Sequence, residues 1–241
     1  MDRTLDCAAF VGLDWADEEH AFSILVGVWL PDDENTRSLR LLSEQRRAWV
    51  EQRVGLENEL RQRLKDSYPL ALNNAIAECD QQIAERFAQH PDQDLFTSFP
   101  GAGQALAPRL AAAFGTNRDK FPASQDLQQI SGIAPITRRS GKTRVVLVRR
   151  ACPKFLRQTF HEFARCSTRF STWAQAYLKM RTAAGDRYHV ILRSLAFKWQ
   201  RILFRCWKNR QAYDEQRCLQ RLRVTGSNLI PFLPSSGAPT P

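Results

Sequence analysis

One stretch of the chain, residues 131–144, constrains the fold more than any other, because it fixes where a helix ends and where a strand turns. Gly132 can adopt the left-handed backbone that ends many helices, and Pro135 favours an extended backbone at the residue before it. Ser140 begins a tight turn, and the β-branched run at residues 145–148 predicts a strand that leaves this turn. The sequence therefore predicts a helix end and a short β-hairpin with a serine at its tip.

Cationic residues surround this serine: Arg138, Arg139, Lys142 and Arg144 lie within four positions of Ser140. Such a hydroxyl can meet a phosphate as a nucleophile, or it can be a turn residue in a basic hairpin that binds the nucleic-acid backbone. No His or Asp that could act as a base is close in the sequence. Local chemistry alone therefore favours the basic hairpin.

Positive charge is concentrated in the second half of the chain. Residues 138–223 hold 22 Lys and Arg against four Asp and Glu, whereas the remainder of the 241 residues holds 13 against 21. This division predicts a polyanion as the partner of the second half, and nucleic acid is the first candidate. An anionic membrane surface is the alternative, but the basic helices carry apolar faces that suit a core.

The six cysteines do not indicate a metal site, since none forms a Cys-x-x-Cys pair and the four histidines form no His-x-x-x-His pair. There is no charged-then-apolar signal segment and no apolar run long enough to span a bilayer. We therefore expect a cytoplasmic protein with reduced thiols and no membrane partner.

The first thirty residues predict two strands, at 9–14 and 20–26, joined by a polar turn. Asp14 ends the first strand, where nucleases of the ribonuclease-H type hold a catalytic Mg²⁺. One carboxylate is a weak signal, and a surface turn residue is the simpler interpretation of Asp14.

A helical hairpin is predicted to follow, with a first helix that is capped at Asn35 or Thr36 and reaches residue 66, and a second helix at 71–89. Its apolar positions have helical spacing and are Leu39, Leu42, Trp49, Leu56 and Leu60, then Ala75, Ile76, Cys79, Ile83 and Phe87, with Arg46 and Arg53 at two seam positions. Self-association and packing within the chain are both compatible with this pattern.

Gly101 and Gly103 precede a helix at 104–114 and resemble the turn of a helix-hairpin-helix module, in which glycine backbone approaches a phosphate. Two basic amphipathic helices follow, from Pro153 onward and at 188–208. Their inward residues are Phe155, Leu156, Phe160 and Phe163, then Leu192, Leu195, Trp199, Ile202 and Cys206. Their outward residues are Lys154, Arg157, His161 and Arg165, then Lys198, Arg201, Arg205 and Lys208.

Several motifs, in order, make residues 31–222 resemble bacterial insertion-sequence transposases of the DEDD type. They are residues 132–135 (Gly-Ile-Ala-Pro), 139–142 (Arg-Ser-Gly-Lys), 149–153 (Arg-Arg-Ala-Cys-Pro) with Leu156 and Arg157, Trp173 and Ala174 with Tyr177, and residues 192–203. Residues 11–16 are similar to the family's first catalytic strand. The family joins a resolvase-like N-terminal domain to a serine-bearing C-terminal domain.

The resemblance implies an enzyme that cuts and rejoins DNA through a serine nucleophile and four acids that bind Mg²⁺. By position, Ser140 matches the serine, and Asp14 matches the first acid as a catalytic and metal-binding residue. It also implies a homo-oligomer and a guide RNA encoded by the element. The residues that we expect to contact DNA or RNA are Gly101, Gly103, Arg138, Arg139, Lys142, Arg144, Arg149, Arg150, Arg157, Arg193, Lys198, Arg201 and Arg205.

The chain departs from the family where it passes directly from residue 30 to a turn containing Asp32 and Asp33, which do not match the family's Asp pair. Three of the four metal-binding acids are therefore missing, so we expect an internally deleted transposase with impaired activity. The alternative is an inactive nucleic-acid-binding remnant that interferes with a full-length relative. A helical adaptor for an acidic protein is a third hypothesis, which gives no role to Gly101, Gly103 or Ser140.

The predicted fold class is mostly α with a small β component. It consists of a truncated ribonuclease-H-like β-hairpin, a long helical hairpin, and a helical domain with a helix-hairpin-helix-like element and a short β-hairpin. The corresponding domains are a resolvase-like remnant at 1–30, a helical hairpin at 31–92 that could multimerise, a serine-bearing DNA-binding domain at 93–223 and a disordered tail at 224–241.

Overall fold

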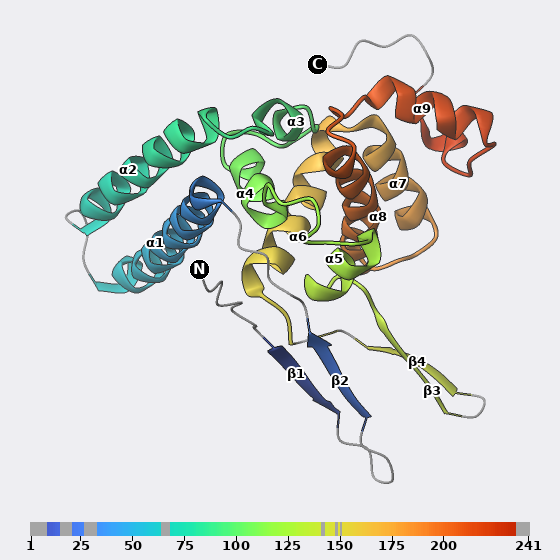
Figure 1. Cartoon of the computed structure of the whole chain (residues 1–241), viewed down its shortest axis with the longest axis horizontal. Coiled ribbons are helices and arrows are strands. Elements are labelled where there is room, and N and C mark those ends of the chain that lie inside the picture. Colours follow the sequence, from blue (N-terminus) through green and yellow to red (C-terminus); the bar gives the residue numbers. More distant parts are fainter. Residues whose placement is uncertain are drawn as a thin grey trace, which may run out of the picture.

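Helices packed around one core make up most of the protein (Figure 1). The computed structural model describes residues 9–14, 21–26, 33–63, 68–140, 143–147, 149 and 151–234. The description is of the backbone alone at residues 9–14, 21–26, 57–63, 68–71, 137–140 and 143–147.

The elements are, in chain order, β1 (Ala9–Asp14), β2 (Ala21–Val26), α1 (Glu34–Arg63), α2 (Tyr68–Ala88), α3 (Gln93–Thr97), α4 (Leu106–Phe114), α5 (Ser124–Ile130), β3 (Ile136–Ser140), β4 (Thr143–Leu147), α6 (Lys154–Phe170), α7 (Thr172–Ala183), α8 (Tyr188–Lys208), α9 (Glu215–Val224) and the 3₁₀ helix η1 (Ile230–Phe232). None of the helices in the described part of the chain has the length and apolar character needed to cross a membrane.

The predicted fold class is wrong in the role that it gives to strands. We expected a ribonuclease-H-like β-hairpin and a short β-hairpin as components of the architecture. Among the described residues, β1 pairs only with β2 and β3 only with β4, so no sheet of three or more strands forms. A lone strand pair buries too little apolar surface to organise a domain. Helices therefore supply the packing, and the fold is mostly α.

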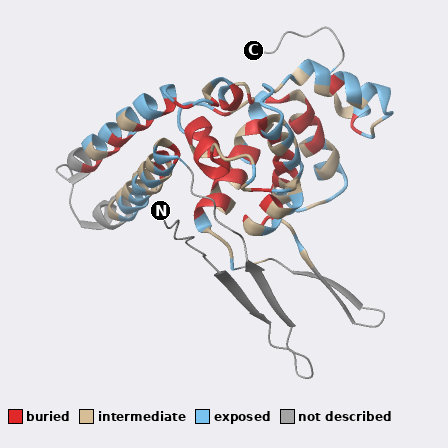
Figure 2. Ribbon diagram, viewed as in Figure 1, coloured by how far each residue is buried: buried red, intermediate tan, exposed pale blue. Residues whose placement is uncertain are grey.

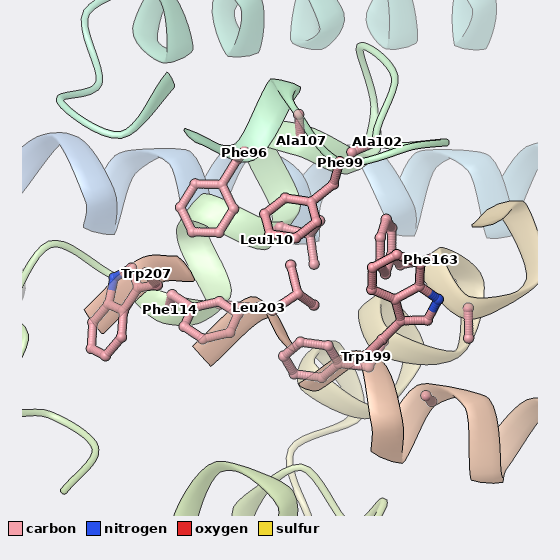
Figure 3. Packing of buried hydrophobic residues seen from close by; sticks show 14 of the residues in the cluster. Phe96, Phe99, Ala102, Ala107, Leu110, Phe114, Phe163, Trp199, Leu203 and Trp207 are labelled. Atoms are coloured by element: carbon pink, nitrogen blue, oxygen red, sulfur yellow. The ribbon is translucent and has the colours of Figure 1, made fainter. Parts of the chain in front are cut away.

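Aromatic side chains form the centre of the core (Figure 3). Phe99 packs edge-on against Phe163 and Trp199, with ring centroids 6.2 Å away in each case. At the C-terminal end of α8, the ring centroid of Trp207 lies 5.3 Å from that of Phe114. Edge and tilted contacts of this kind add to the free energy gained by removing large rings from water. The core therefore ties α4, α6 and the turn that follows α3 to α8, and Figure 2 shows buried residues concentrated on α4, α6 and α8.

Two fully buried indoles, those of Trp199 and Trp207, each have a hydrogen-bond partner. The Nε1–H of Trp199 donates to the Ser167 hydroxyl at 2.7 Å, and that of Trp207 donates to the Gly115 carbonyl at 2.8 Å. A buried N–H without a partner would cost about 1–3 kcal/mol. These bonds therefore fix the orientation of both rings and, with it, the rotation of α8 in the core.

The helical hairpin packs within the chain, as one of the two interpretations predicted. α1 and α2 lie side by side, and α1 also contacts α4 (Figure 1). Leu39, Ile83 and Phe87 are buried in the core that they share with later helices. At a seam position, Arg46 forms an ion pair with Asp80 of α2, so a cation is accommodated at the edge of the contact.

The cap of α1 differs from the prediction, because Asp33 and not Asn35 or Thr36 takes this position. The Asp33 carboxylate accepts hydrogen bonds from the backbone N–H of Thr36 at 3.0 Å and from its hydroxyl at 2.7 Å. The hydroxyl of Thr116 also donates to it. Burial raises the pKa of Asp33, but these hydrogen bonds outweigh burial and lower it.

Part of the tail that we predicted to be disordered is ordered. η1 contacts α7, and Leu229 is buried against the core. The sequence pattern missed this segment because one buried leucine and a short 3₁₀ turn leave no periodicity to detect. Residues 235–241 lie outside the described residues.

Candidate nucleic-acid interface

The β3–β4 pair places Ser140 far from the helical core. The register pairs Ile136 with Leu147 at one end and Ser140 with Thr143 at the other. Figure 1 shows the pair projecting away from the helices, so Ser140 ends β3 at the distal end of the projection. The side chains of Ser140 and of the predicted contacts Arg138, Arg139 and Arg144 lie outside the described side chains, and Lys142 and Arg150 lie outside the described residues.

Gly132 ends α5 as the sequence predicted. Its φ is +69°, its N–H donates to the Gln129 carbonyl at 3.0 Å, and the N–H of Ala134 returns to the Gln128 carbonyl at 2.9 Å. A Cβ on this residue would lie 2.4 Å from the Sγ of Cys152. Both the left-handed backbone and the close approach of the segment before α6 therefore require glycine here.

Side chains from α8 attach the base of the strand pair to the core. Gln200 is fully buried and donates from Nε2 to the Ser131 hydroxyl at 2.7 Å. Arg193 donates from Nε to the Ile133 carbonyl at 3.2 Å and from Nη2 to the Ala134 carbonyl at 3.5 Å. The chain entering β3 is therefore held by hydrogen bonds to its backbone and to a buried serine.

A group of cationic and imidazole side chains lies beside this attachment; we call it the basic cluster and define it as Arg157, His161, His189 and Arg193. Arg157 and His161 are four residues apart on α6, as are His189 and Arg193 on α8, and the two helices pack together. Residues with this spacing share one helix face. The two pairs are therefore on neighbouring helices at the base of the strand pair.

The electrostatics of the basic cluster are those of positive groups held close together. Burial lowers the pKa of His161, and the charges of Arg193, Arg157 and His189 lower it further. Burial also lowers the pKa of Arg193, with a further contribution from Arg157. Each change opposes protonation, as expected where cations repel one another in a partly buried site.

The other predicted contacts on α8 form an exposed basic face. Lys198, Arg201 and Arg205 are exposed. The Nζ of Lys198 lies 5.2 Å above the ring of Tyr177, while partial burial and the charges of Arg201 and Arg181 lower its pKa. Arg149 precedes α6, and its Nε is buried without a hydrogen-bond partner in the described part of the chain.

The two glycines of the α3–α4 turn have different roles. Gly101 has φ +84°, and a Cβ there would lie 3.1 Å from the Cys166 backbone carbon of α6. Its missing side chain thus serves close packing inside the protein. A Cβ on Gly103 would meet nothing within 4 Å, so its backbone is open to an outside partner. Of the two predicted phosphate contacts, Gly103 has the more suitable surroundings.

A magnesium centre does not fit the residues described. In the register of β1 and β2, Asp14 pairs with Ala21, and it is the only acid in either strand. Among the described residues, no three His, Cys, Asp or Glu side chains gather as metal ligands. Two-metal chemistry needs several oxygen ligands that converge on the ions, so we derive no metal-dependent step for this chain.

Sequence reasoning gave no role to His189 and treated His161 only as part of an outward face. The signal that could have found them is the repeated pair of a histidine and an arginine four residues apart on two amphipathic helices. By contrast, the motif residues Trp173 and Tyr177 are buried, and the Tyr177 hydroxyl lies 2.6 Å from that of Ser194. Those residues stabilise the core.

The part of the chain that matches a known family runs from α3 into α7 and includes the projecting strand pair. Residues 93–179 match the Transposase IS116/IS110/IS902 family. This match includes Gly101, Gly103 and Ser140, and it supports an insertion-sequence transposase.

Two relatives are also proteins of insertion elements. The chain is 31% identical over 140 residues to a mini-circle protein of Streptomyces coelicolor named as a transposase for IS117, an alignment covering 58% of this chain and 34% of the relative. It is 27% identical over 145 residues to the uncharacterised 42 kDa protein of insertion element IS900 from Mycobacterium paratuberculosis, covering 60% and 36%. The matched part thus spans about a third of each relative's length.

Proposed function

We propose that this chain is a DNA-binding, serine-bearing part of an insertion-sequence transposase. The observation that carries the proposal is the family match over residues 93–179. The geometry agrees with it, because the strand pair carries Ser140 outward while the basic cluster and the exposed cations of α8 provide positive charge for a polyanion. Contacts of this kind bind phosphates without reading sequence.

The chemistry proposed for Ser140 is attack of its Oγ on a backbone phosphorus. A phosphoserine bond forms, the bond from phosphorus to one deoxyribose oxygen breaks, and that oxygen leaves as a hydroxyl. The reverse attack by another strand's hydroxyl rejoins the DNA. Mg²⁺ held by acids of the DEDD type remains part of the family expectation, as do a guide RNA and a homo-oligomer.

The second candidate is a DNA-binding remnant without catalytic activity. One specific observation favours it, namely that the β1–β2 pair contains a single acid. Either a natural internal deletion between the second strand and the long helix or a mis-stitched gene would explain this, and in the second case the DNA around the start of the gene would encode the absent carboxylates.

The test compares the purified chain with Ser140→Ala on a DNA fragment carrying the element end. We expect both proteins to bind with affinity that falls steeply as salt rises, because phosphate contacts release counterions. Strand cutting would leave a covalent protein–DNA adduct with the wild type and none with Ser140→Ala. DNA binding by both without an adduct supports the remnant, whereas binding insensitive to salt contradicts both candidates.

A further inference from the structure

We propose that Arg157, His161, His189 and Arg193 form a phosphate-binding site at the base of the strand pair, and that His161 takes up a proton when a phosphate binds. The inference rests on the proposed function only in naming a DNA backbone phosphate as the ligand. It adds a site and a pH dependence that the family match does not assign.

Two packed helices, α6 and α8, each contribute hydrogen-bond donors to the basic cluster. Arg193 is held by the carbonyls of Ile133 and Ala134 through Nε and Nη2, which uses two of its five N–H donors. Its position is therefore fixed while further donors remain for a ligand. Arg157 lies close enough for its charge to act on Arg193 and His161, and all three side chains are half-buried. A guanidinium pair with an imidazole matches the oxygens of a phosphate.

The charges that face His161 come from both packed helices. On its own helix the charge that acts on His161 is that of Arg157, and from α8 the charges are those of His189 and Arg193. The neighbouring acid, Glu162, is bound to Arg47 and Arg109. The charges that shift the pKa of His161 are therefore all cationic in the described part of the chain.

A phosphate reverses this balance. In the free protein, burial and then the neighbouring cations lower the pKa of His161 and so disfavour its imidazolium form; the neutral ring has one N–H donor. A bound phosphate adds negative charge, which favours the imidazolium and gives the ring two donors. Because proton and phosphate binding are reciprocally linked, the affinity for phosphate rises as the pH falls.

The experiment measures the pKa of His161 by NMR in the full chain, alone, with a short DNA duplex and with inorganic phosphate. His161→Gln assigns the resonance, and Arg169→Gln is the matched control, because Arg169 is exposed on the same helix outside the basic cluster. Affinity for the duplex is followed by fluorescence anisotropy between about pH 8 and about pH 6, the range in which histidine titrates.

We expect the pKa of His161 to rise with either ligand, and duplex affinity to increase roughly tenfold on acidification, the factor that corresponds to one unit of pKa. Arg169→Gln keeps both effects, and Arg157→Gln, which tests the site if His161→Gln does not fold, diminishes them. If DNA binds but the pKa stays unchanged, the inference is overturned while the proposed function stands. A rise with inorganic phosphate and no DNA binding rejects DNA as the source, and with it the proposed function.

Discussion

Glu162 and His161 are adjacent residues of α6, and each lies near cations. The cations near Glu162 bind its carboxylate, whereas those near His161 act on an imidazole. Glu162 accepts a hydrogen bond from Arg47 Nη1 at 2.6 Å and another from Arg109, whose guanidinium also donates to Thr159 at 3.2 Å. His161 belongs to the basic cluster, where the charges acting on it are cationic. One helix therefore carries a neutralised group and a positive group at adjacent positions.

The pKa values show what each arrangement does. Burial raises the pKa of Glu162, but the hydrogen bonds and charges of Arg47 and Arg109 outweigh burial and lower it. The Glu162 carboxylate thereby connects α1 and α4 to α6 in the folded state. In the basic cluster, burial lowers the pKa of His161 and repulsion by the neighbouring cations lowers it further, and an outside anion would relieve that repulsion. The cations around Glu162 stabilise the fold, whereas the charges that act on His161 favour an anionic ligand.

The largest expected effect comes from Gly132→Ala, which disturbs the attachment beside the basic cluster. The new Cβ would clash with Cys152 and hold a non-glycine residue at φ +69°. We expect the free energy of unfolding to fall by about 2–4 kcal/mol, from overpacking and backbone strain together. Chemical denaturation measures it. Gly103→Ala, at an open position, is the control, and an equal loss there would contradict this account.

Glu162→Gln removes the ion pairs of Glu162 with Arg47 and Arg109. The substitution leaves Arg47 and Arg109 without their carboxylate, and the Arg109 side chain is only 11% exposed. Because Glu162 itself is 40% exposed, we expect a loss of about 1–3 kcal/mol, between the values for surface and buried ion pairs. Thermal unfolding measures it. DNA affinity should not fall, and a marked drop would show that the two groups are not independent.

Arg193→Gln removes one guanidinium from the basic cluster instead. We expect DNA affinity to fall about tenfold and the slope of log K against log salt to decrease by about 1, because one phosphate contact is lost. Stability should fall by about 1 kcal/mol through loss of the hydrogen bonds to Ile133 and Ala134. Anisotropy titrations over several salt concentrations, with Arg169→Gln as the control, measure the DNA affinity and its salt slope. An unchanged salt slope would place the phosphate elsewhere.

The smallest effect is on the pH dependence of stability. The folded-state pKa of His161 is lowered from 6.5, so its contribution is present above about pH 6.5 and is lost as the pH falls below it. The pKa of Glu162 is lowered from 4.5, so its contribution is lost only below about pH 4.5. When the free energy of unfolding is measured across pH, His161→Gln should lack the decrease that begins below about pH 6.5, and Glu162→Gln should lack the one that begins below about pH 4.5. Identical profiles would refute the distinction.

Helical periodicity allowed much of the fold to be predicted from the sequence. The limits of α8, the buried face of α6 and the helix end at Gly132 follow from local spacing and backbone preference. The cap of α1 did not, because Asp33 is fixed partly by Thr116, which is distant in the sequence. The fold class failed for a related reason, since local patterns detect strand pairs but not whether further strands join them.

The candidate site was predictable in composition but not in arrangement. Arg157 and Arg193 were expected as contacts because the second half of the chain is strongly basic. Some cations are paired with acids that are distant in the sequence, as Arg47 is with Glu162, 115 positions away. A local sequence pattern cannot show such pairs. The packing role of Gly101 against α6 was hidden for the same reason.

The strand pair is attached to α8 at its base and projects from there, so a small change of angle at the base moves its tip. A five-residue strand is roughly 17 Å long, so a rotation of about 10° at the base would displace its tip by roughly 3 Å. The hydrogen bonds from Gln200 and Arg193 are made to residues just before β3, at the base of the pair. The position of the Ser140 backbone is consequently sensitive to the hydrogen bonds at the base, because a small rotation there would move the tip by more than the length of a covalent bond.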